Sequence, residues 1–259
     1  MIDWIAEVMR AKSARRLARI QTLWSGYGEV FRVALDGGIA PTAIVKHVKP
    51  PRAARGTTSD RRKRRSYDVE AVFYRDFASR LPGRTARLYG DRVRDDEWLF
   101  VLEDLGDRRT PSLPDCLAWL ASFHRTFMSD RGDGLWPTGT YWYLETRIEE
   151  VVTDLARARA LDHQLAGASY QTLVHGDAKE ENFCIAPDGE IAAYDFQYVG
   201  RGCGIRDVAY LLHGHRDIER HLAHYFAALG APRELEDEWR ALYPIAVADF
   251  ERFLDGWQG

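Results

Sequence analysis

The chain has 259 residues, and its 36 Lys and Arg side chains nearly balance 39 Asp and Glu, for a formal net charge of −3. That balance excludes a histone-like or membrane-adsorbed cationic protein, and a composition with 46% apolar and 29% charged residues excludes global disorder. Its apolar runs are too short to cross a bilayer, its start lacks a secretory pattern, and its three cysteines show no paired spacing. We therefore expect a cytoplasmic protein with no membrane partner and no disulfide scaffold.

The first part of the chain is predicted to be rich in strands. Residues 3–23 carry apolar side chains at roughly helical spacing and predict a helix. Alternating patterns at 29–35 and 42–48, joined through Asp36-Gly37-Gly38, predict a hairpin. The next predicted features are a break over 50–65, a helix from an N-cap at Ser59 or Asp60 to about Leu81, and two strands within 84–105 around Asp95-Asp96.

The later part of the chain is predicted to be mostly helical. Helices are expected over 114–128 and 146–165 and from 205 to the end, with brief strand signals between 173 and 198. A strand-rich beginning followed by a helix-rich end indicates a two-lobed α+β layout with its seam near Asp104.

The segment that carries chemistry is Val174-His175-Gly176-Asp177-Ala178-Lys179-Glu180-Glu181-Asn182, a polar loop between apolar flanks. Asp177 can accept a proton from a hydroxyl nucleophile, and Lys179 could neutralise charge on a phosphoryl group. Asn182 and the later Asp195 offer the hard oxygen ligands that Mg²⁺ prefers. These are the parts that phosphoryl transfer requires.

His175-x-Asp177-x-x-x-x-Asn182, followed by Asp195-Phe196-Gln197, resembles the catalytic loop and metal-binding acid of the protein-kinase-like fold. Gly176 and Gln197 resemble the small-molecule branch, which includes aminoglycoside phosphotransferases, choline kinases and ecdysteroid-kinase-like proteins. The local sequence is most similar to the ecdysteroid-kinase-like group.

The resemblance implies a bilobal α+β fold with a small antiparallel-sheet N-lobe and a mostly helical C-lobe. Residues 1–103 would form the nucleotide-binding lobe, and residues 104–259 the catalytic and acceptor-binding lobe. The implied reaction transfers the γ-phosphate of ATP to a hydroxyl of a small molecule. Asp177 would act as base, Lys179 would assist catalysis, and Mg²⁺ would be held by Asn182 and Asp195.

Further parts of the same pattern follow in the expected order. Gly26, Tyr27 and Gly28 resemble a degenerate nucleotide-covering loop, a weak signal taken alone. Lys46, with Lys49 as its rival, resembles the lysine that holds the α- and β-phosphates. The remaining assignments by resemblance are Glu70 as the partner of Lys46, Glu103 and Leu105 as the hinge that meets the adenine, and Asp207 as an acid that supports the catalytic loop.

Three alternative functions stay open at this stage. Lys179 also resembles the catalytic-loop lysine of Ser/Thr protein kinases, although the stretch from Asp195 to Asp207 is short and no Ala-Pro-Glu follows. A catalytically silent nucleotide-binding module is the second alternative. The third is a nucleic-acid binder that uses Arg61–Arg65, but no aromatic residue interleaves with these charges, so we interpret them as a solvated loop or helix start.

For two histidines and for one aromatic cluster, the sequence allows a purely structural role as well as a functional one. We expect His175 to hold the loop and His124 to belong to the edge of the core, neither acting as a catalyst. The aromatic residues between Trp136 and Tyr143 could line an acceptor pocket or simply pack a long connection. The identity of the acceptor, the choice of ATP or GTP, and the oligomeric state cannot be read from the sequence.

Overall fold

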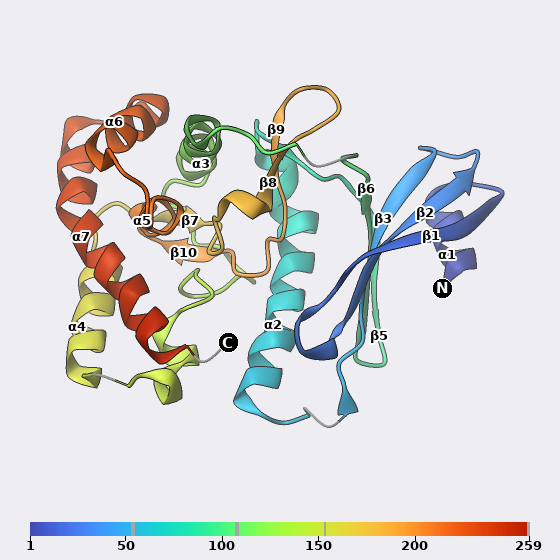
Figure 1. Cartoon of the computed structure of the whole chain (residues 1–259), viewed down its shortest axis with the longest axis horizontal. Helices are drawn as coiled ribbons and strands as arrows, with labels where there is room; N and C mark the ends of the chain where they lie inside the picture. Colours follow the sequence, from blue (N-terminus) through green and yellow to red (C-terminus); the bar gives the residue numbers. More distant parts are fainter. Residues whose placement is uncertain (53–54, 107–108, 153, 258–259) are drawn as a thin grey trace.

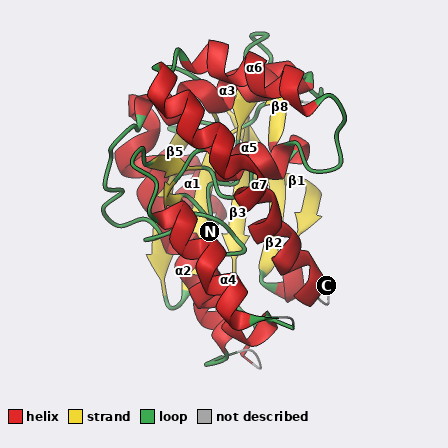
Figure 2. Cartoon of the chain, turned by 90° about the vertical axis from the view of Figure 1, so that its left-hand side faces the viewer, coloured by secondary structure: helices red, strands yellow, loops and turns green. Residues whose placement is uncertain are grey.

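The computed structural model describes residues 1–52, 55–106, 109–152 and 154–257. An antiparallel sheet forms one side of the molecule and a group of helices the other, and helix α2 (Thr58–Val72) stands between them (Figure 1). Seen from the helical side, the helices lie in front of the strands (Figure 2). The predicted α+β fold is confirmed, since strands dominate the first part of the chain and helices the second.

The main sheet has two differently covered faces. Its strands, in spatial order, are β1 (Ser13–Thr22), β2 (Gly28–Asp36), β3 (Thr42–Val48), β6 (Glu97–Glu103) and β5 (Leu88–Arg94). Neighbouring side chains on a strand point to opposite faces. Val45 and Val101 therefore pack in a core with helix α1 (Ile2–Val8), whereas Val48 and Phe100 pack in the main core with helix α2. Both predicted pairs of strands, β2–β3 and β5–β6, are confirmed.

The second part of the chain combines helices with very short strands. The helices are α3 (Leu113–Thr126), α4 (Leu155–Ala166), α5 (Ile205–Leu211), α6 (Ile218–Leu229) and α7 (Arg233–Gly256). The short strands are β7 (Thr172–Val174), which pairs with β10 (Gly200–Gly202), and β8 (Phe183–Ile185), which pairs with β9 (Ile191–Ala193). Within the described part of the chain, no helix combines the length and apolar character that crossing a bilayer requires.

The division at 103/104 is not tested by these contacts and stays a prediction. Strand β4 (Arg84–Thr85), which lies before that point, pairs in parallel with β9. The main hydrophobic core also draws on both parts, from Leu23 to Ala246. The two parts of the chain are therefore joined through backbone hydrogen bonds and through shared apolar packing.

The helix predicted over 3–23 is wrong beyond its first turns. The helix ends at Val8, Arg10 adopts a positive φ of 53°, and β1 follows. β1 is an edge strand with nearly all of its residues exposed, so it lacks the apolar alternation that marks a half-buried strand. Pairing with β2 decides its conformation, and the spacing of Leu17 and Ile20 only imitates a helix.

Two helix boundaries also differ from the prediction. Helix α2 begins at Thr58 with Thr57 as N-cap, whose hydroxyl accepts the N–H of Asp60, so the expected break does not extend to residue 65. In the range 146–165, short 3-10 turns replace the first half of the predicted helix. Helix α4 begins only at Leu155, after the cap residue Asp154.

Candidate active site

The polar loop that follows β7 is anchored by hydrogen bonds to one buried carboxylate. The backbone N–H groups of His175 and Gly176 donate to Asp207 of α5, at 2.6 and 2.9 Å. Nε2 of the buried His124 lies 3.1 Å from the same carboxylate, and its Nδ1 lies 2.7 Å from the hydroxyl of Tyr225. Because these groups are all buried, their hydrogen bonds hold the start of the loop in one place.

Gly176 makes the tight path of this loop possible. Its φ is +79°, a region that favours glycine. A Cβ atom built on Gly176 would lie 2.2 Å from the carbonyl oxygen of Tyr198, which is backbone and cannot turn aside. A side chain at position 176 would therefore push the loop away from the segment that follows Asp195.

Gly176→Ala should destabilise the protein and disturb the loop. We expect a loss of about 2–4 kcal/mol in the free energy of unfolding, because an unfavourable φ and a backbone overlap add together. Denaturant unfolding measures this loss. Gly189→Ala is the matched control, since Gly189 also has a positive φ of 88° but open space around it, and it should lose only about 1 kcal/mol. Equal losses in the two variants would contradict the close approach.

Asp177 lies in the loop with a separate donor for each carboxylate oxygen. Oδ2 accepts from the amide nitrogen of Asn182 at 2.9 Å and lies 3.4 Å from Nζ of Lys179. Oδ1 accepts from the hydroxyl of Tyr210 at 3.2 Å. Burial raises the pKa of the Asp177 carboxyl to about 7, even though Lys179 and Asn182 both favour its charged form. A carboxyl with this pKa is suited to exchange a proton near neutral pH.

Lys46 joins three segments that are far apart in sequence. Its Nζ lies 2.8 Å from Oε2 of Glu70 on α2 and 2.9 Å from Oδ1 of Asp195. Burial opposes the charge of Lys46, but the two carboxylates outweigh it and hold the pKa of the ammonium above its usual value. Burial raises the pKa of Glu70 to about 7. Lys49 is largely exposed and pairs instead with Glu97, at 2.7 Å.

The Lys46 group adjoins the Asp177 group. The charge of Asp195 contributes to the raised pKa of Asp177, and Lys179 helps to lower the pKa of Asp195. Six residues predicted for the site, from both parts of the chain, therefore act on one another. They are Lys46, Glu70, Asp177, Lys179, Asn182 and Asp195.

Asp195 and Asn182 have the chemistry of a magnesium site. Burial opposes ionisation of Asp195, but Lys46 outweighs it and lowers the pKa of that carboxyl, which is one-third exposed at 33%. Asn182 donates from its amide nitrogen to the backbone and side chain of Asp177, so its carbonyl oxygen, rather than its nitrogen, is the atom that could serve as a ligand. Among the described residues, no group of three or more His, Cys, Asp or Glu side chains could hold a metal alone. A carboxylate and an amide carbonyl are oxygen donors that would suit Mg²⁺, so the chemistry of these two residues fits the predicted ion.

Asp195 has an unusual backbone conformation and is followed by the buried Phe196. The φ of Asp195 is +66°, which is uncommon for a residue other than glycine. The ring of Phe196 is fully buried and stacks on Phe73, with ring centroids 4.0 Å apart. It also contacts the ring of His175 at 4.9 Å, and Nε2 of His175 lies 3.1 Å from the carbonyl of Tyr194. His175 therefore packs and orients the loop.

The predicted nucleotide-covering loop is tied to the start of α2. The hydroxyl of Tyr27 donates to Asp60 at 2.6 Å, and Tyr27 is buried. Gly26 and Gly28 have positive φ values, and a Cβ atom on Gly28 would lie 2.0 Å from the carbonyl oxygen of His47 on β3. These glycines are needed for the turn itself.

The predicted hinge follows β6. Both carboxylate oxygens of Glu103 accept from the guanidinium of Arg84 at 2.7 Å, so this side chain is engaged within the protein. Leu105 is partly buried against the apolar cluster that contains Cys184 and Ala192. Asp104 pairs with Arg32, at 2.6 Å. The role of Glu103 and Leu105 as the hinge that meets the adenine stays a prediction.

Comparison with known proteins gives the family. A model of the phosphotransferase enzyme family matches residues 19–245, which is most of the chain. The chain belongs to this family. This phosphotransferase is an enzyme with a kinase-like fold, and the resemblance to small-molecule kinases is confirmed. The match does not single out the ecdysteroid-kinase-like group, which stays a prediction. No curated protein sequence matches the chain significantly.

Solved structures share the fold of this phosphotransferase at low sequence identity. A candidate fructosamine-3-kinase from Haemophilus somnus is 15% identical, with a TM-score of 0.58 over 99% of this chain and 91% of that one. The choline kinase from Streptococcus pneumoniae is 14% identical, with a TM-score of 0.55 over 98% and 95%. A thermostable aminoglycoside phosphotransferase mutant, in a complex with ADP and hygromycin B, is 14% identical, with a TM-score of 0.51 over 99% and 95%.

The basic run of the phosphotransferase lies in the first turns of α2, as a helix start. Its side chains form hydrogen bonds and ion pairs within the protein. This arrangement does not favour the alternative that they bind nucleic acid. Arg62 donates to the carbonyl of Thr146 and pairs with Glu150, and Arg65 donates to two carbonyls of the second part. The other contacts run from Arg61 to Gly56, from Lys63 to Ser25 and from Arg64 to Asp60.

The aromatic residues between 136 and 143 divide into two groups. Trp136 and Trp142 are buried, and their indole N–H groups donate to Gln197 and Asp249, so packing explains them. Tyr141 is only partly buried, and its ring lies 5.6 Å from that of Tyr210. Our sequence analysis missed Tyr210. Its one signal was a polar aromatic residue three positions after Asp207, on the same short helix.

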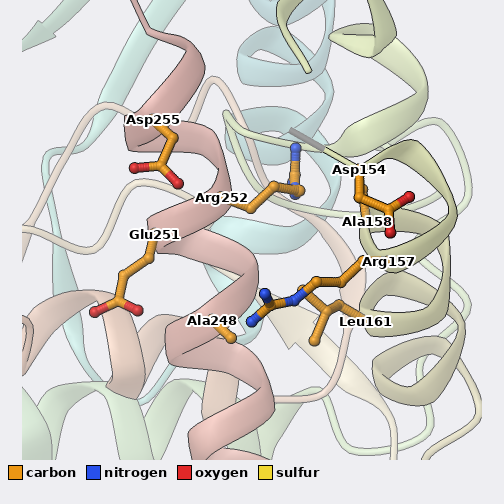
Figure 3. Close-up of a pocket in the computed structure, with 8 residues that line it drawn as sticks. All are labelled: Asp154, Arg157, Ala158, Leu161, Ala248, Glu251, Arg252 and Asp255. Atoms are coloured by element: carbon orange, nitrogen blue, oxygen red, sulfur yellow. The ribbon is translucent and has the colours of Figure 1, made fainter. Parts of the chain in front are cut away.

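A separate pocket lies between α4 and α7 (Figure 3). It has a volume of about 120 Å³ and is lined by charges of both signs. None of the predicted site residues lines it. The lining residues are Asp154, Arg157, Ala158, Leu161, Ala248, Glu251, Arg252 and Asp255.

Proposed function

We propose that this phosphotransferase transfers the γ-phosphate of ATP to a hydroxyl group of a small molecule, in one direct step. The observation that carries the proposal is the ion pairing of Lys46 with both Glu70 and Asp195, next to Asp177. A lysine fixed in this way is placed to bind nucleotide phosphates, and a buried acid beside it is placed to receive the proton of an acceptor.

Each residue has a defined part in the proposed reaction. Asp177 orients the acceptor hydroxyl and takes its proton, and Lys179 stabilises negative charge on the phosphoryl group. Lys46, oriented by Glu70, holds the nucleotide phosphates. Asn182 and Asp195 would hold Mg²⁺, which when bound neutralises charge on the phosphate oxygens.

The same proposal assigns the nucleotide to the first part of the chain, residues 1–103, and the acceptor to residues 104–259. The loop at Gly26–Gly28 would cover the phosphates, and the backbone of Glu103 and Leu105 would meet the adenine. Related folds support an adenine nucleotide, because the choline kinase has also been solved with AMP and the aminoglycoside enzyme with ADP. We also keep a cytoplasmic location as a proposal, which fits three buried cysteines that form no disulfide among the described residues.

A screen for acceptor-dependent release of ADP tests this proposal. The panel contains sugars, amino alcohols, aminoglycosides and sterol-like alcohols, with MgCl₂ and ATP. We expect at least one of them to raise ADP release well above the rate with water alone. EDTA should abolish the increase, and excess Mg²⁺ should restore it, because only two protein oxygens would hold the ion.

The alternatives give different results in the same assay. Transfer to a panel of peptides but to no small alcohol would favour a protein kinase. The contact between Lys179 and Asp177 is the observation that favours this alternative. Binding of Mg-ATP without transfer to any acceptor would favour a silent module. Affinity for nucleic acid that falls steeply with salt and survives Lys46→Ala would favour a role for Arg61–Arg65.

A further inference from the structure

Tyr210 on α5 contacts the proposed base at the carboxylate oxygen that Asn182 does not bind. Its hydroxyl donates to Oδ1 of Asp177 at 3.2 Å, while Oδ2 accepts from Asn182 and faces Lys179. Oδ2 of the carboxylate therefore has two neighbouring donors, and Oδ1 has one. Because a carboxylate oxygen has two lone pairs, Oδ1 keeps one position for a further donor.

The position of Tyr210 is determined by aromatic packing around it. Its ring centroid lies 4.7 Å from that of Phe250 and 5.1 Å from that of Trp142. Tyr141, which is partly buried, lies 5.6 Å away and shares a hydrogen bond with the Tyr210 hydroxyl. The backbone N–H of Tyr141 donates to the carbonyl of Gly176, so this neighbour is tied to the same loop as Asp177.

The Tyr210 hydroxyl acts as a donor that keeps its own proton. Burial, together with the negative charge of Asp177, raises its pKa above the usual value of a tyrosine. Tyr210 therefore does not compete with Asp177 as a base. It can only direct the carboxylate and stabilise its charge.

We propose that Tyr210 is a positioning residue of the phosphotransferase site, which turns Oδ1 of Asp177 toward the acceptor hydroxyl. This inference rests on the proposed function. In the step itself, the proton of the acceptor hydroxyl passes to Oδ1, and the acceptor oxygen forms its bond to the γ-phosphorus. The bond from that phosphorus to the bridging oxygen breaks, and ADP leaves. Tyr210 gains and loses no atom.

Tyr210→Phe tests the role of the hydroxyl, because the ring and its packing stay in place. We expect kcat with the acceptor found in the screen to fall about tenfold, the size of one hydrogen bond to a charged group. The KM for ATP should stay within about twofold, and the melting temperature should stay close to that of the parent. Tyr243→Phe is the control, since Tyr243 is a partly buried tyrosine on α7 outside the predicted site and the aromatic segment 136–143, and this variant should keep the parent kcat.

A double variant separates positioning from general structural support. If Tyr210 acts through Asp177, Tyr210→Phe should change the residual kcat of Asp177→Asn less than about twofold, because the two residues then work as one unit. A full tenfold loss in that background would overturn the proposal. If Tyr210→Phe does not fold, Tyr141→Phe carries the test, with an expected loss of about threefold.

The outcomes also separate this inference from the proposed function. If the parent enzyme transfers phosphate to no hydroxyl acceptor, the proposed function fails and Tyr210 loses its role with it. If the parent transfers phosphate and Tyr210→Phe keeps the same kcat, only the inference about Tyr210 is overturned.

Discussion

Asp177→Asn should lower kcat by about a thousandfold while the affinity for nucleotide changes less than about threefold. The amide has nearly the same shape as the carboxylate. Its oxygen can accept from Asn182 while its NH2 group faces the hydroxyl oxygen of Tyr210, which can also accept, so the loop should keep its structure. It cannot take a proton from the acceptor, and a positioned base contributes about 10²–10⁴ in rate. Radiometric transfer assays measure the residual kcat, and calorimetric titration with Mg-ATP measures the affinity.

A surface variant controls for charge loss in this experiment. Asp237→Asn removes a carboxylate on the exposed face of α7, where it faces Arg233 at 3.6 Å, and it should leave kcat unchanged. Turnover of Asp177→Asn at the parent rate would show that Asp177 is not the base. A loss of nucleotide binding as large as the loss of kcat would point to a damaged loop.

Lys46→Met should strongly lower turnover and also destabilise the protein, by about 3 kcal/mol at pH 8.5. The side chains of Lys46 and Glu70 are only 7% and 2% exposed, and removal of one partner leaves a buried charge without its counterion. We expect kcat to fall by about 10²–10³, because the phosphates lose their fixed cation. Denaturant unfolding and the transfer assay measure the two effects. Lys49→Met, which breaks an exposed ion pair, should cost less than about 1 kcal/mol and keep kcat.

The destabilisation of Lys46→Met should depend on pH in one direction. Burial already raises the pKa of Glu70 to about 7, above the value of an unfolded chain. The folded variant therefore binds a proton that the unfolded chain releases, so its stability is highest at low pH and is lost as pH rises through the folded pKa. The loss relative to the parent should shrink at pH 6.

A second substitution tests that origin. Lys46→Met combined with Glu70→Gln removes the cation and the carboxylate together, so most of the stability at pH 8.5 should return while turnover does not. If the double variant were as unstable at pH 8.5 as Lys46→Met alone, an unpaired Glu70 could not be the cause.

Much of the site could be predicted from sequence because its parts lie in short, ordered motifs. The loop from His175 to Asn182 and the acid at Asp195 form local motifs, and the pairing of Lys46 with Glu70 was implied by the resemblance that these motifs carry. The antiparallel hairpins were visible for the same reason, since Gly-rich turns and alternating side chains are local signals.

The parts that were missed depend on contacts between distant segments. β1 is a strand because it pairs with β2, and an exposed edge strand carries no apolar period of its own. The contact of Tyr210 with Asp177 joins residues 33 positions apart, and the one local signal, its place three positions after Asp207, does not specify that contact. The same holds for His124, whose ring meets Asp207 only after α3 and α5 have packed.

The main core that crosses the predicted boundary limits how this chain could be divided. Phe73, before that boundary, stacks on Phe196, after it. Strand β4, also before the boundary, pairs with β9, after it. The smaller core beneath α1 lies within the first portion, but the main core contains side chains from both portions. A chimera that exchanges one of them with a relative would have to redesign both sides of this seam together, and heat should melt the whole chain in a single cooperative transition.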